Sequence, residues 1–510
     1  MNNREKVGQR LVIGLPDTDL DDATRQLIEE YKFGNFILFR RNIESRDQLK
    51  ELCRQLQQQT RKATGHDAFI TIDQEGGMVT RLSEDCANIP GAMAISATGE
   101  PKNAYLCGKL TAQELRSLGV NFNLAPVADI NSNPQNPVIG VRSFGDRPEK
   151  AIPYLLEMTR GFRDGGVLSA AKHFPGHGDT SVDSHLGLPC VDKSLDELMA
   201  CELTTFRALI QEGIPAVMTT HILFPQLDSS GVPATMSRAI ITGLLKQTLG
   251  FQGLVISDCM EMNAIGVYYG TVNGVLAAAG AGVDLIFISN SHELARKASD
   301  RMVEALEKGE LDSAEMDESV EKILRCKDDI GKVQPGPFDM REGKRVCYEV
   351  LRKSLTPCQM PQALPVPDES TCYLSCNQFR ATNVSNEESD ALNFARYLAE
   401  HLGGKAIVFR PDPTKKEIQE ILRQTEGAKK VIIGTYNGHL NPGQLDLVRA
   451  FAEQCPQVAV FALRNPYDLK ELPETVCGIA AYEYTRCCFD AIIELLRGSL
   501  IPTGKLPIRI

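Results

Sequence analysis

The densest group of reactive side chains lies between Lys172 and His185, in the stretch KHFPGHGDTSVDSH. It contains three of the eight histidines, together with two aspartates and a lysine. Two glycines and a proline interrupt the stretch, so we expect a loop. The loop follows the apolar run 167–171, which predicts a short buried strand. A polar loop after a buried strand is typical of an active site, and the alternative is a surface loop rich in turn formers.

Within this loop, Asp183 stands two residues before His185. A histidine titrates near neutral pH, so it can both donate and accept a proton. A neighbouring carboxylate could hold its second ring nitrogen, fix the tautomer and raise its basicity. The spacing fits an acid–base pair and an incidental hydrogen bond equally well.

A single carboxylate, Asp258, ends the apolar run 254–257. It could serve as a nucleophile or as an electrostatic stabiliser. The local sequence favours a simpler role as the N-cap of a following helix. A position at the end of a barrel strand would instead favour catalysis.

A third polar stretch, IDQEGGMVTRL, contains Asp73 and Arg81, which could bind hydroxyl groups. Its glycine pair, 76–77, lets the backbone approach closely. The stretch lacks the pattern GxxxxGK followed by Ser or Thr, so it is no phosphate loop. A solvated turn between a strand and a helix explains it about as well.

A metal site is a further possibility, because the loop 172–185 offers imidazole and carboxylate groups. His173 and His177 are four residues apart, but the glycine and proline between them argue against a helix. The spacing matches neither HExxH nor a zinc finger, so we expect no metal.

Eight short apolar segments alternate with helical patterns before about residue 330. Near-continuous apolar runs are expected of strands that are buried on both faces. The pattern predicts a (β/α)8 TIM-like barrel, and an open doubly wound sheet is the alternative. The predicted strands are 11–15, 35–39, 68–72, 121–126, 167–171, 216–220, 254–257 and 284–288; helical patterns include 45–62, 104–118 and 195–212.

Polar side chains follow five of these strands: Asp73, Asp129, the pair 172–173, His221 and Asp258. In a barrel, the carboxyl ends of the strands gather at one rim, where catalysis takes place. In an open sheet they would spread along a line. The barrel therefore predicts one common site.

The helical patterns 293–308 and 313–330 close the barrel, and GKVQPGP after them predicts a linker. The remaining segments predict a smaller α/β/α sandwich. We therefore divide the chain into a barrel domain at 1–332, a linker at 333–345 and a sandwich domain at 346–510. The sandwich strands are predicted at 372–374, 406–409, 430–434, 458–462 and 478–482, and its helices at 391–402 and 445–454.

The composition of the 510-residue chain restricts its partners and its compartment. A net charge of -11 without a basic run argues against nucleic acid. No apolar run approaches the roughly 20 residues of a membrane helix, and we expect no signal peptide because the apolar stretch near the N-terminus is short and no small-residue cleavage site follows it. Fifteen cysteines, an odd number, predict reduced thiols in the cytoplasm. Because tryptophan is absent, polar contacts would carry any recognition of a sugar.

Taken together, these stretches resemble glycoside hydrolase family 3, in its β-N-acetylglucosaminidase branch. The resemblance covers the whole barrel part, and the rest is similar to the family's sandwich domain. The last residues, PTGKLPIRI, resemble the family's final strand. The motifs that carry the resemblance are IDQEGGMVTRL, NLAPVADIN, GVRSFGDRP, KHFPGHGDTSVDSH, VMTTHILFP and VISDCMEM.

The resemblance implies a retaining exo-β-N-acetylglucosaminidase that acts on small carbohydrates, namely cell-wall muropeptides or chitin oligosaccharides. Asp258, in the motif SDxxxM, would be the nucleophile. His185 with Asp183 would replace the carboxylic acid that most retaining glycosidases use as acid/base. Such a cycle needs neither a metal nor an organic cofactor. The sugar-binding residues that the motifs imply are Asp73, Arg81, Arg142, Lys172 and His173.

Three alternatives remain. A neutral histidine does not repel an anion, so phosphate could replace water and make the chain a β-N-acetylglucosaminide phosphorylase. A β-glucosidase of the same family would need a carboxylic acid donor from the second domain. A sugar-binding relic would lack Asp258 or His185, and both are present.

Overall fold

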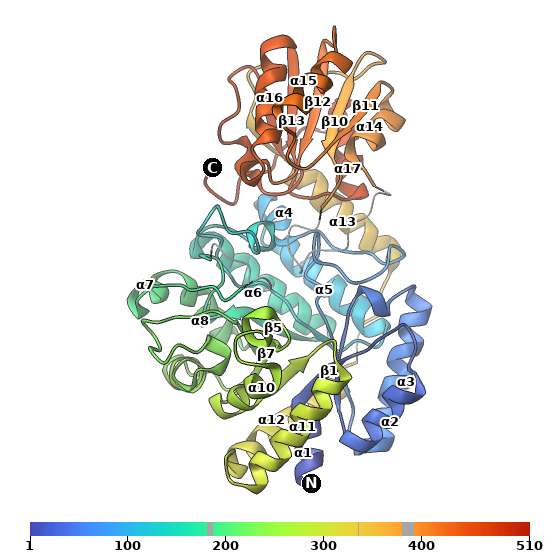
Figure 1. Cartoon of the computed structure of the whole chain (residues 1–510). Coiled ribbons are helices and arrows are strands. Elements are labelled where there is room, and N and C mark those ends of the chain that lie inside the picture. The colour runs from blue at the N-terminus through green and yellow to red at the C-terminus, as the bar shows by residue number, and fades with distance from the viewer. Residues whose placement is uncertain (181–186, 335, 380–391) are drawn as a thin grey trace.

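The computed structural model describes residues 1–180, 187–334, 336–379 and 392–510, which form a barrel and a second sheet (Figure 1). Eight parallel strands follow one another around the barrel, and β1 closes it by pairing with β8. The predicted barrel is therefore confirmed against the open sheet. Its strands are β1 Leu11–Gly14, β2 Asn35–Leu38, β3 Phe69–Ile72, β4 Phe122–Asn123, β5 Leu168–Phe174, β6 Ala216–Thr219, β7 Leu254–Cys259 and β8 Leu285–Ile288.

Helices surround this barrel, and local signals set their ends. The Ser45 hydroxyl accepts a hydrogen bond from the backbone N–H of Gln48 at 3.3 Å and so caps the first turn of α3. Gly65, at φ 78°, ends the same helix in the left-handed conformation that glycine tolerates. The barrel helices are α1 Asn3–Arg10, α2 Asp22–Tyr31, α3 Arg46–Thr64, α4 Ala92–Ala97, α5 Lys102–Ser117, α6 Pro148–Gly165, α7 Leu195–Ala200, α8 Glu202–Glu212, α9 Asn263–Gly266, α10 Thr271–Ala281, α11 His292–Glu307 and α12 Ser313–Lys332, with the π-helix η4 Ala239–Thr248 and the 3-10 turns η1 Arg40–Asn42, η2 Gly140–Arg142 and η3 Ala234–Met236.

The interior of the barrel is a packed apolar core. Phe69 and Phe122 meet edge to face at 5.5 Å between ring centroids, among aliphatic side chains from the other strands. Such a core leaves no channel, so a ligand can enter only at an end of the barrel. A larger apolar cluster joins the outside of the barrel to its helices.

Two barrel strands run further than the sequence predicts. β5 continues through Lys172 and His173, and β7 continues through Asp258, so these residues lie within strands rather than in the loops after them. The pairing of β5 with β6 extends to this point, where Lys172 is in register with Met218. The apolar pattern stops earlier than the strand, since the last side chains of each strand face the polar end of the barrel.

The second sheet has the order β11-β10-β12-β13-β14-β9, and only β9 is antiparallel. Helices cover both of its faces (Figure 1), which confirms the predicted α/β/α sandwich. Its strands are β9 Thr356–Gln359, β10 Cys372–Cys376, β11 Lys405–Phe409, β12 Lys430–Thr435, β13 Gln457–Ala462 and β14 Cys477–Ala480; its helices are α13 Met340–Ser354, α14 Phe394–Leu402, α15 Lys415–Gln424, α16 Gly443–Gln454 and α17 Arg486–Leu496, with the 3-10 turns η5 Gly438–Leu440 and η6 Pro466–Leu469.

Two predictions about this sheet are wrong. The edge strand β9 is missing from the sequence prediction, because TPCQ contains a proline and lacks an apolar alternation. The expected final strand does not form, since residues 497–510 follow α17 without regular structure. Lys505 instead donates its backbone N–H to the Ala97 carbonyl at 2.8 Å, which fastens the chain end to the barrel.

The barrel and the sandwich share apolar contacts. Met93, Ala94, Ala97 and Val141 of the barrel lie in the same buried cluster as the sandwich strands. Helix α13 begins at Met340, inside the predicted linker 333–345. The division of the chain into a barrel domain, a linker and a sandwich domain at these residues stays a prediction. Of the helices in the described residues, none is both long and apolar enough to cross a membrane.

Candidate active site

A cavity of about 410 Å³ opens at the carboxyl ends of the barrel strands. Six predicted site residues line it together: Asp73, Arg81, Arg142, Lys172, His173 and Asp258. The other two predicted residues, Asp183 and His185, lie outside the described residues. The structure thus gathers one site from side chains that are up to 185 positions apart in the sequence, from Asp73 to Asp258.

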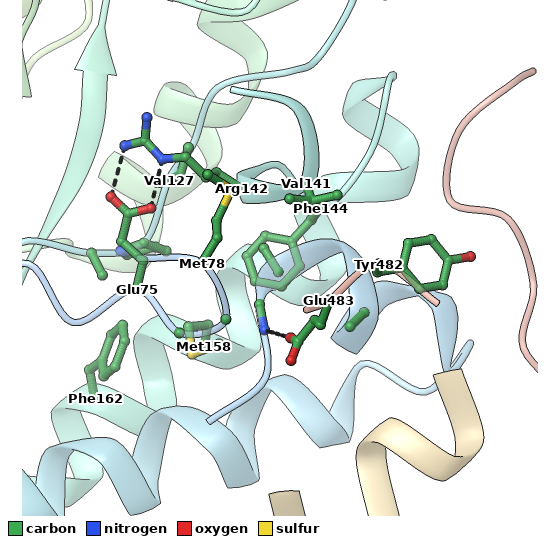
Figure 2. Close-up of a pocket in the computed structure, with 17 residues that line it drawn as sticks. Glu75, Met78, Val127, Val141, Arg142, Phe144, Met158, Phe162, Tyr482 and Glu483 are labelled. Atoms are coloured by element: carbon green, nitrogen blue, oxygen red, sulfur yellow. Dashed lines mark hydrogen bonds and ion pairs between the residues drawn. The ribbon is translucent and has the colours of Figure 1, made fainter. Parts of the chain in front are cut away.

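A buried ion-pair network holds Lys172 in the wall of this cavity. Its ammonium lies 2.7 Å from Asp73 Oδ1 and 2.6 Å from Glu75 Oε1. Arg142 binds the same Glu75 with two parallel hydrogen bonds of 2.8 Å each (Figure 2). Such a bidentate contact fixes both the position and the orientation of the two side chains. Because the Lys172 side chain is only 2 % exposed, the network replaces water as its environment.

The charges in this network stabilise one another. Burial alone would raise the pKa of Glu75, but Arg142 and Lys172 together hold it well below the ordinary range of a glutamate. Burial would likewise lower the pKa of Lys172, whereas Asp73 and Glu75 raise it. An ammonium group has three N–H donors, and Asp73 and Glu75 use two of them. One donor is therefore left for a ligand.

Asp129, which follows β4, orients His173. Its carboxylate lies 2.6 Å from His173 Nδ1 and also accepts the backbone N–H groups of His173 and His177. With Nδ1 engaged, Nε2 is the ring nitrogen that remains for a ligand. Burial would raise the pKa of Asp129, but His173 and His177 lower it. His177 itself is buried beside His173, which lowers its pKa to about 4 and keeps it neutral.

Asp258 stands half-buried near the end of β7, and its Oδ1 accepts the Cys259 backbone N–H at 2.7 Å. His221, after β6, fixes this strand end from the side. It donates through Nε2 to the Cys259 carbonyl at 3.0 Å, while its Nδ1 lies 2.9 Å from Thr235 Oγ1. A carboxylate held in this way can attack an electrophilic carbon placed in the cavity.

Sequence reasoning missed the role of Glu75 and gave Asp129 and His221 positions without roles. Glu75 stands two residues after Asp73 in the motif IDQEGG, which is the one local signal for it. Among the described residues, no group of three histidines, cysteines or acidic residues is arranged to hold a metal ion.

Residues 3–326 match the family described as glycosyl hydrolase family 3 N terminal domain. The chain belongs to glycosyl hydrolase family 3. A relative in this family is beta-hexosaminidase A from Pseudoalteromonas piscicida, which is 38% identical over 559 residues; the match covers 97% of this chain and 92% of that protein. The beta-hexosaminidase of Haemophilus influenzae (strain PittEE) is 34% identical over 288 residues, which cover 56% of this chain and 80% of that protein.

Solved structures of family 3 agree with both parts of the fold. The glycoside hydrolase family 3 beta-N-acetylglucosaminidase from Paenibacillus sp. superposes with a TM-score of 0.92 and is 34% identical. The superposition covers 100% of this chain and 99% of that chain, so it includes the barrel and the sandwich. The resemblance that the motifs predict is therefore confirmed at the level of the family and the fold.

Proposed function

We propose that this chain is a retaining exo-β-N-acetylglucosaminidase that releases terminal N-acetylglucosamine from muropeptides or chitin oligosaccharides. The observation that supports this most is a single cavity that Asp258 lines together with the five predicted sugar-binding residues. The names of the relatives point the same way, since they are a beta-hexosaminidase and a beta-N-acetylglucosaminidase.

The sugar would be held mainly by charged hydrogen bonds. Lys172 offers its remaining N–H, His173 offers Nε2, and Asp73 accepts from hydroxyl groups. Arg81 and Arg142 brace the subsite. Hydrogen bonds to charged groups are each worth about 1.5–3 kcal/mol, so these contacts can replace the stacking on tryptophan that this chain lacks.

The reaction would proceed in two steps. The Asp258 carboxylate attacks the anomeric carbon, the glycosidic C–O bond breaks, and the leaving oxygen takes a proton from His185. Water then attacks the same carbon and gives a proton to His185, which releases Asp258 and the free sugar. The assignment of His185 and Asp183 rests on their motif and on their position in the sequence after β5.

Two aryl substrates test this proposal. We expect kcat/KM for the p-nitrophenyl β-N-acetylglucosaminide to exceed that for the β-glucoside by at least about 100-fold, because a site built to hydrogen-bond an acetamido group rejects an analogue that lacks it. NMR of the first product should show the β-anomer, since two displacements retain the configuration. A preference for the glucoside or an α-product would contradict the proposal. A β-glucosidase would also need an acid from the sandwich, but all described residues that line the cavity belong to the barrel.

Phosphorolysis is the second candidate, because the proposed acid/base is a histidine and the cavity is lined by several cations, including Arg81, Arg142 and Lys172. Product analysis with and without phosphate separates the two reactions. N-acetylglucosamine 1-phosphate, formed in proportion to phosphate, would establish phosphorolysis. Free N-acetylglucosamine alone at high phosphate would leave hydrolysis as the reaction.

We also propose that the chain acts in the cytoplasm, where cleavage of imported muropeptides recycles the cell wall. None of the fifteen cysteines forms a disulfide, and burial raises the pKa of many of the thiols. Unpaired thiols in such number suit a reducing compartment. Fractionation of the native cells, with immunodetection of the protein in each fraction, tests this location.

A further inference from the structure

One carboxylate of the sandwich reaches into the barrel beside the active site. Glu483 follows β14, and its Oε1 accepts the backbone N–H of Gly91, which stands directly before α4 (Figure 2). The second oxygen lies 3.3 Å from the Thr485 hydroxyl. Among the described residues, Thr485 is the partner of this carboxylate within the sandwich, and Gly91 is its partner in the barrel.

Two glycines of the barrel make room for this carboxylate. A Cβ on Gly77 would lie 3.0 Å from Glu483 Oε1 and 2.9 Å from Gly91 Cα, and one on Gly91 would lie 3.5 Å from the same oxygen. Gly77 also has φ 55°, which a side chain would strain. Gly76 and Gly77 of the motif IDQEGG therefore admit the close approach of the segment 89–91, and Glu483 lies against Gly77 beside Gly91.

The turn that Glu483 contacts carries Glu75. The Glu75 and Gly76 amides both donate to the Val79 carbonyl, at 3.0 and 3.1 Å, which closes the turn. The Gly77 amide donates to the Ile89 carbonyl at 2.9 Å and ties the turn to the segment that ends at Gly91. A displacement of Gly91 would therefore move Glu75, the residue that holds Lys172 and Arg142.

The sandwich also contacts the loop on the other side of this ion pair. Tyr467 of η6 accepts a hydrogen bond from Asn131 Nδ2 at 2.9 Å. Asn131 Oδ1 in turn accepts the Gly140 amide at 3.0 Å, at the start of the turn that ends at Arg142. The two barrel loops whose side chains pair as Glu75 and Arg142 are thus both held by the sandwich.

Burying the Glu483 carboxylate costs free energy, and its contact within the sandwich does not account for this cost. Its residue is 6% exposed, and burial raises its pKa to about 7 because no cation of the described chain offsets the loss of water. An apolar residue here would avoid this cost. The hydrogen bond to Gly91 is the contact that only a polar acceptor supplies.

We propose that Glu483 is a positioning residue for the sugar subsite: by holding Gly91 and the turn 75–79, it sets the orientation in which Glu75 presents Lys172 and Arg142. This inference rests on the proposed function for its kinetic test. It also predicts that the sandwich takes part in sugar binding without lining the cavity.

The test compares Glu483→Ala with Glu483→Gln in the full-length chain. Alanine removes the acceptor for Gly91, so we expect KM for the aryl N-acetylglucosaminide to rise about 10-fold, the effect of losing a contact of roughly 1.4 kcal/mol. The inhibition constant of free N-acetylglucosamine should rise by the same factor. Glutamine keeps an acceptor oxygen and should restore most of the wild-type values. Glu494→Ala, on α17 and paired with Arg352, is the matched control and should change neither constant.

Hydrogen exchange of the segment 75–91 provides a readout without any substrate. We expect faster exchange there in Glu483→Ala and wild-type exchange in Glu483→Gln. Unchanged KM, inhibition constant and exchange, with at most a lower melting temperature, would overturn the proposal and leave Glu483 as a domain contact only. If the wild-type chain cleaves no N-acetylglucosaminide, the proposed function fails, and the exchange result alone decides whether Glu483 positions the turn.

Discussion

Asp258→Gly is expected to lower kcat for an aryl N-acetylglucosaminide by at least about 1,000-fold, because the group that attacks the anomeric carbon is gone. The substitution should impair the chemical step and leave the folding of the chain unchanged. The side chain is half-buried at the edge of the cavity, so its removal leaves the barrel core intact. Steady-state kinetics of the purified variant, with its circular dichroism spectrum beside that of the wild type, checks the result.

Azide distinguishes a lost nucleophile from a merely damaged site. A small anion can enter the space that Asp258 leaves and attack the same face of the sugar, which gives the α-glycosyl azide by a single inversion. Rescue should rise with azide concentration in Asp258→Gly. Asp192→Gly, an exposed position outside the cavity, should keep wild-type activity and show no azide product. A variant that stays active, or a β-azide product, would contradict the role of Asp258.

The sequence predicts the barrel well for a physical reason. Strands such as β1 and β8 are buried on both faces, so their apolar runs stand out from the helices between them. The same signal fails at the site. Lys172, His173 and Asp258 belong to strands, but their polar side chains interrupt the apolar pattern before the strand ends. It fails again for β9, whose short edge position requires no apolar face.

The motifs predict which side chains gather at the cavity, but not what holds them there. Glu75 and Arg142 are separated by 67 residues, and Gly91 and Glu483 by 392. No local period or spacing encodes such contacts, since they depend on how loops after different strands meet. The sequence also does not distinguish a buried glutamate that binds a lysine and an arginine from a glutamate that is exposed to solvent. Its importance shows only in its environment.

Glu75→Gln is therefore expected to lower the free energy of unfolding by about 3 kcal/mol, the usual cost of removing one partner from a buried ion pair. The substitution keeps the shape of the side chain. It replaces one acceptor oxygen by an N–H₂ group that faces Arg142 and Lys172, both of them donors. Lys172 would lose one of its two carboxylate partners, so sugar binding should weaken as well. Urea unfolding followed by circular dichroism and the KM of the variant measure the two effects.

The pH dependence of this difference identifies its cause. The Arg142 and Lys172 cations hold the pKa of Glu75 below its ordinary value of 4.5, so its ionised form stabilises the folded chain fully above that pH. As the pH falls below 4.5, the unfolded chain binds a proton first, and the advantage of the wild type over Glu75→Gln should shrink. Glu51→Gln removes a carboxylate that pairs with Arg54 on the surface, and its stability should stay close to that of the wild type. A stability difference that persists unchanged down to pH 3 would mean that packing, rather than charge, is what Glu75 contributes.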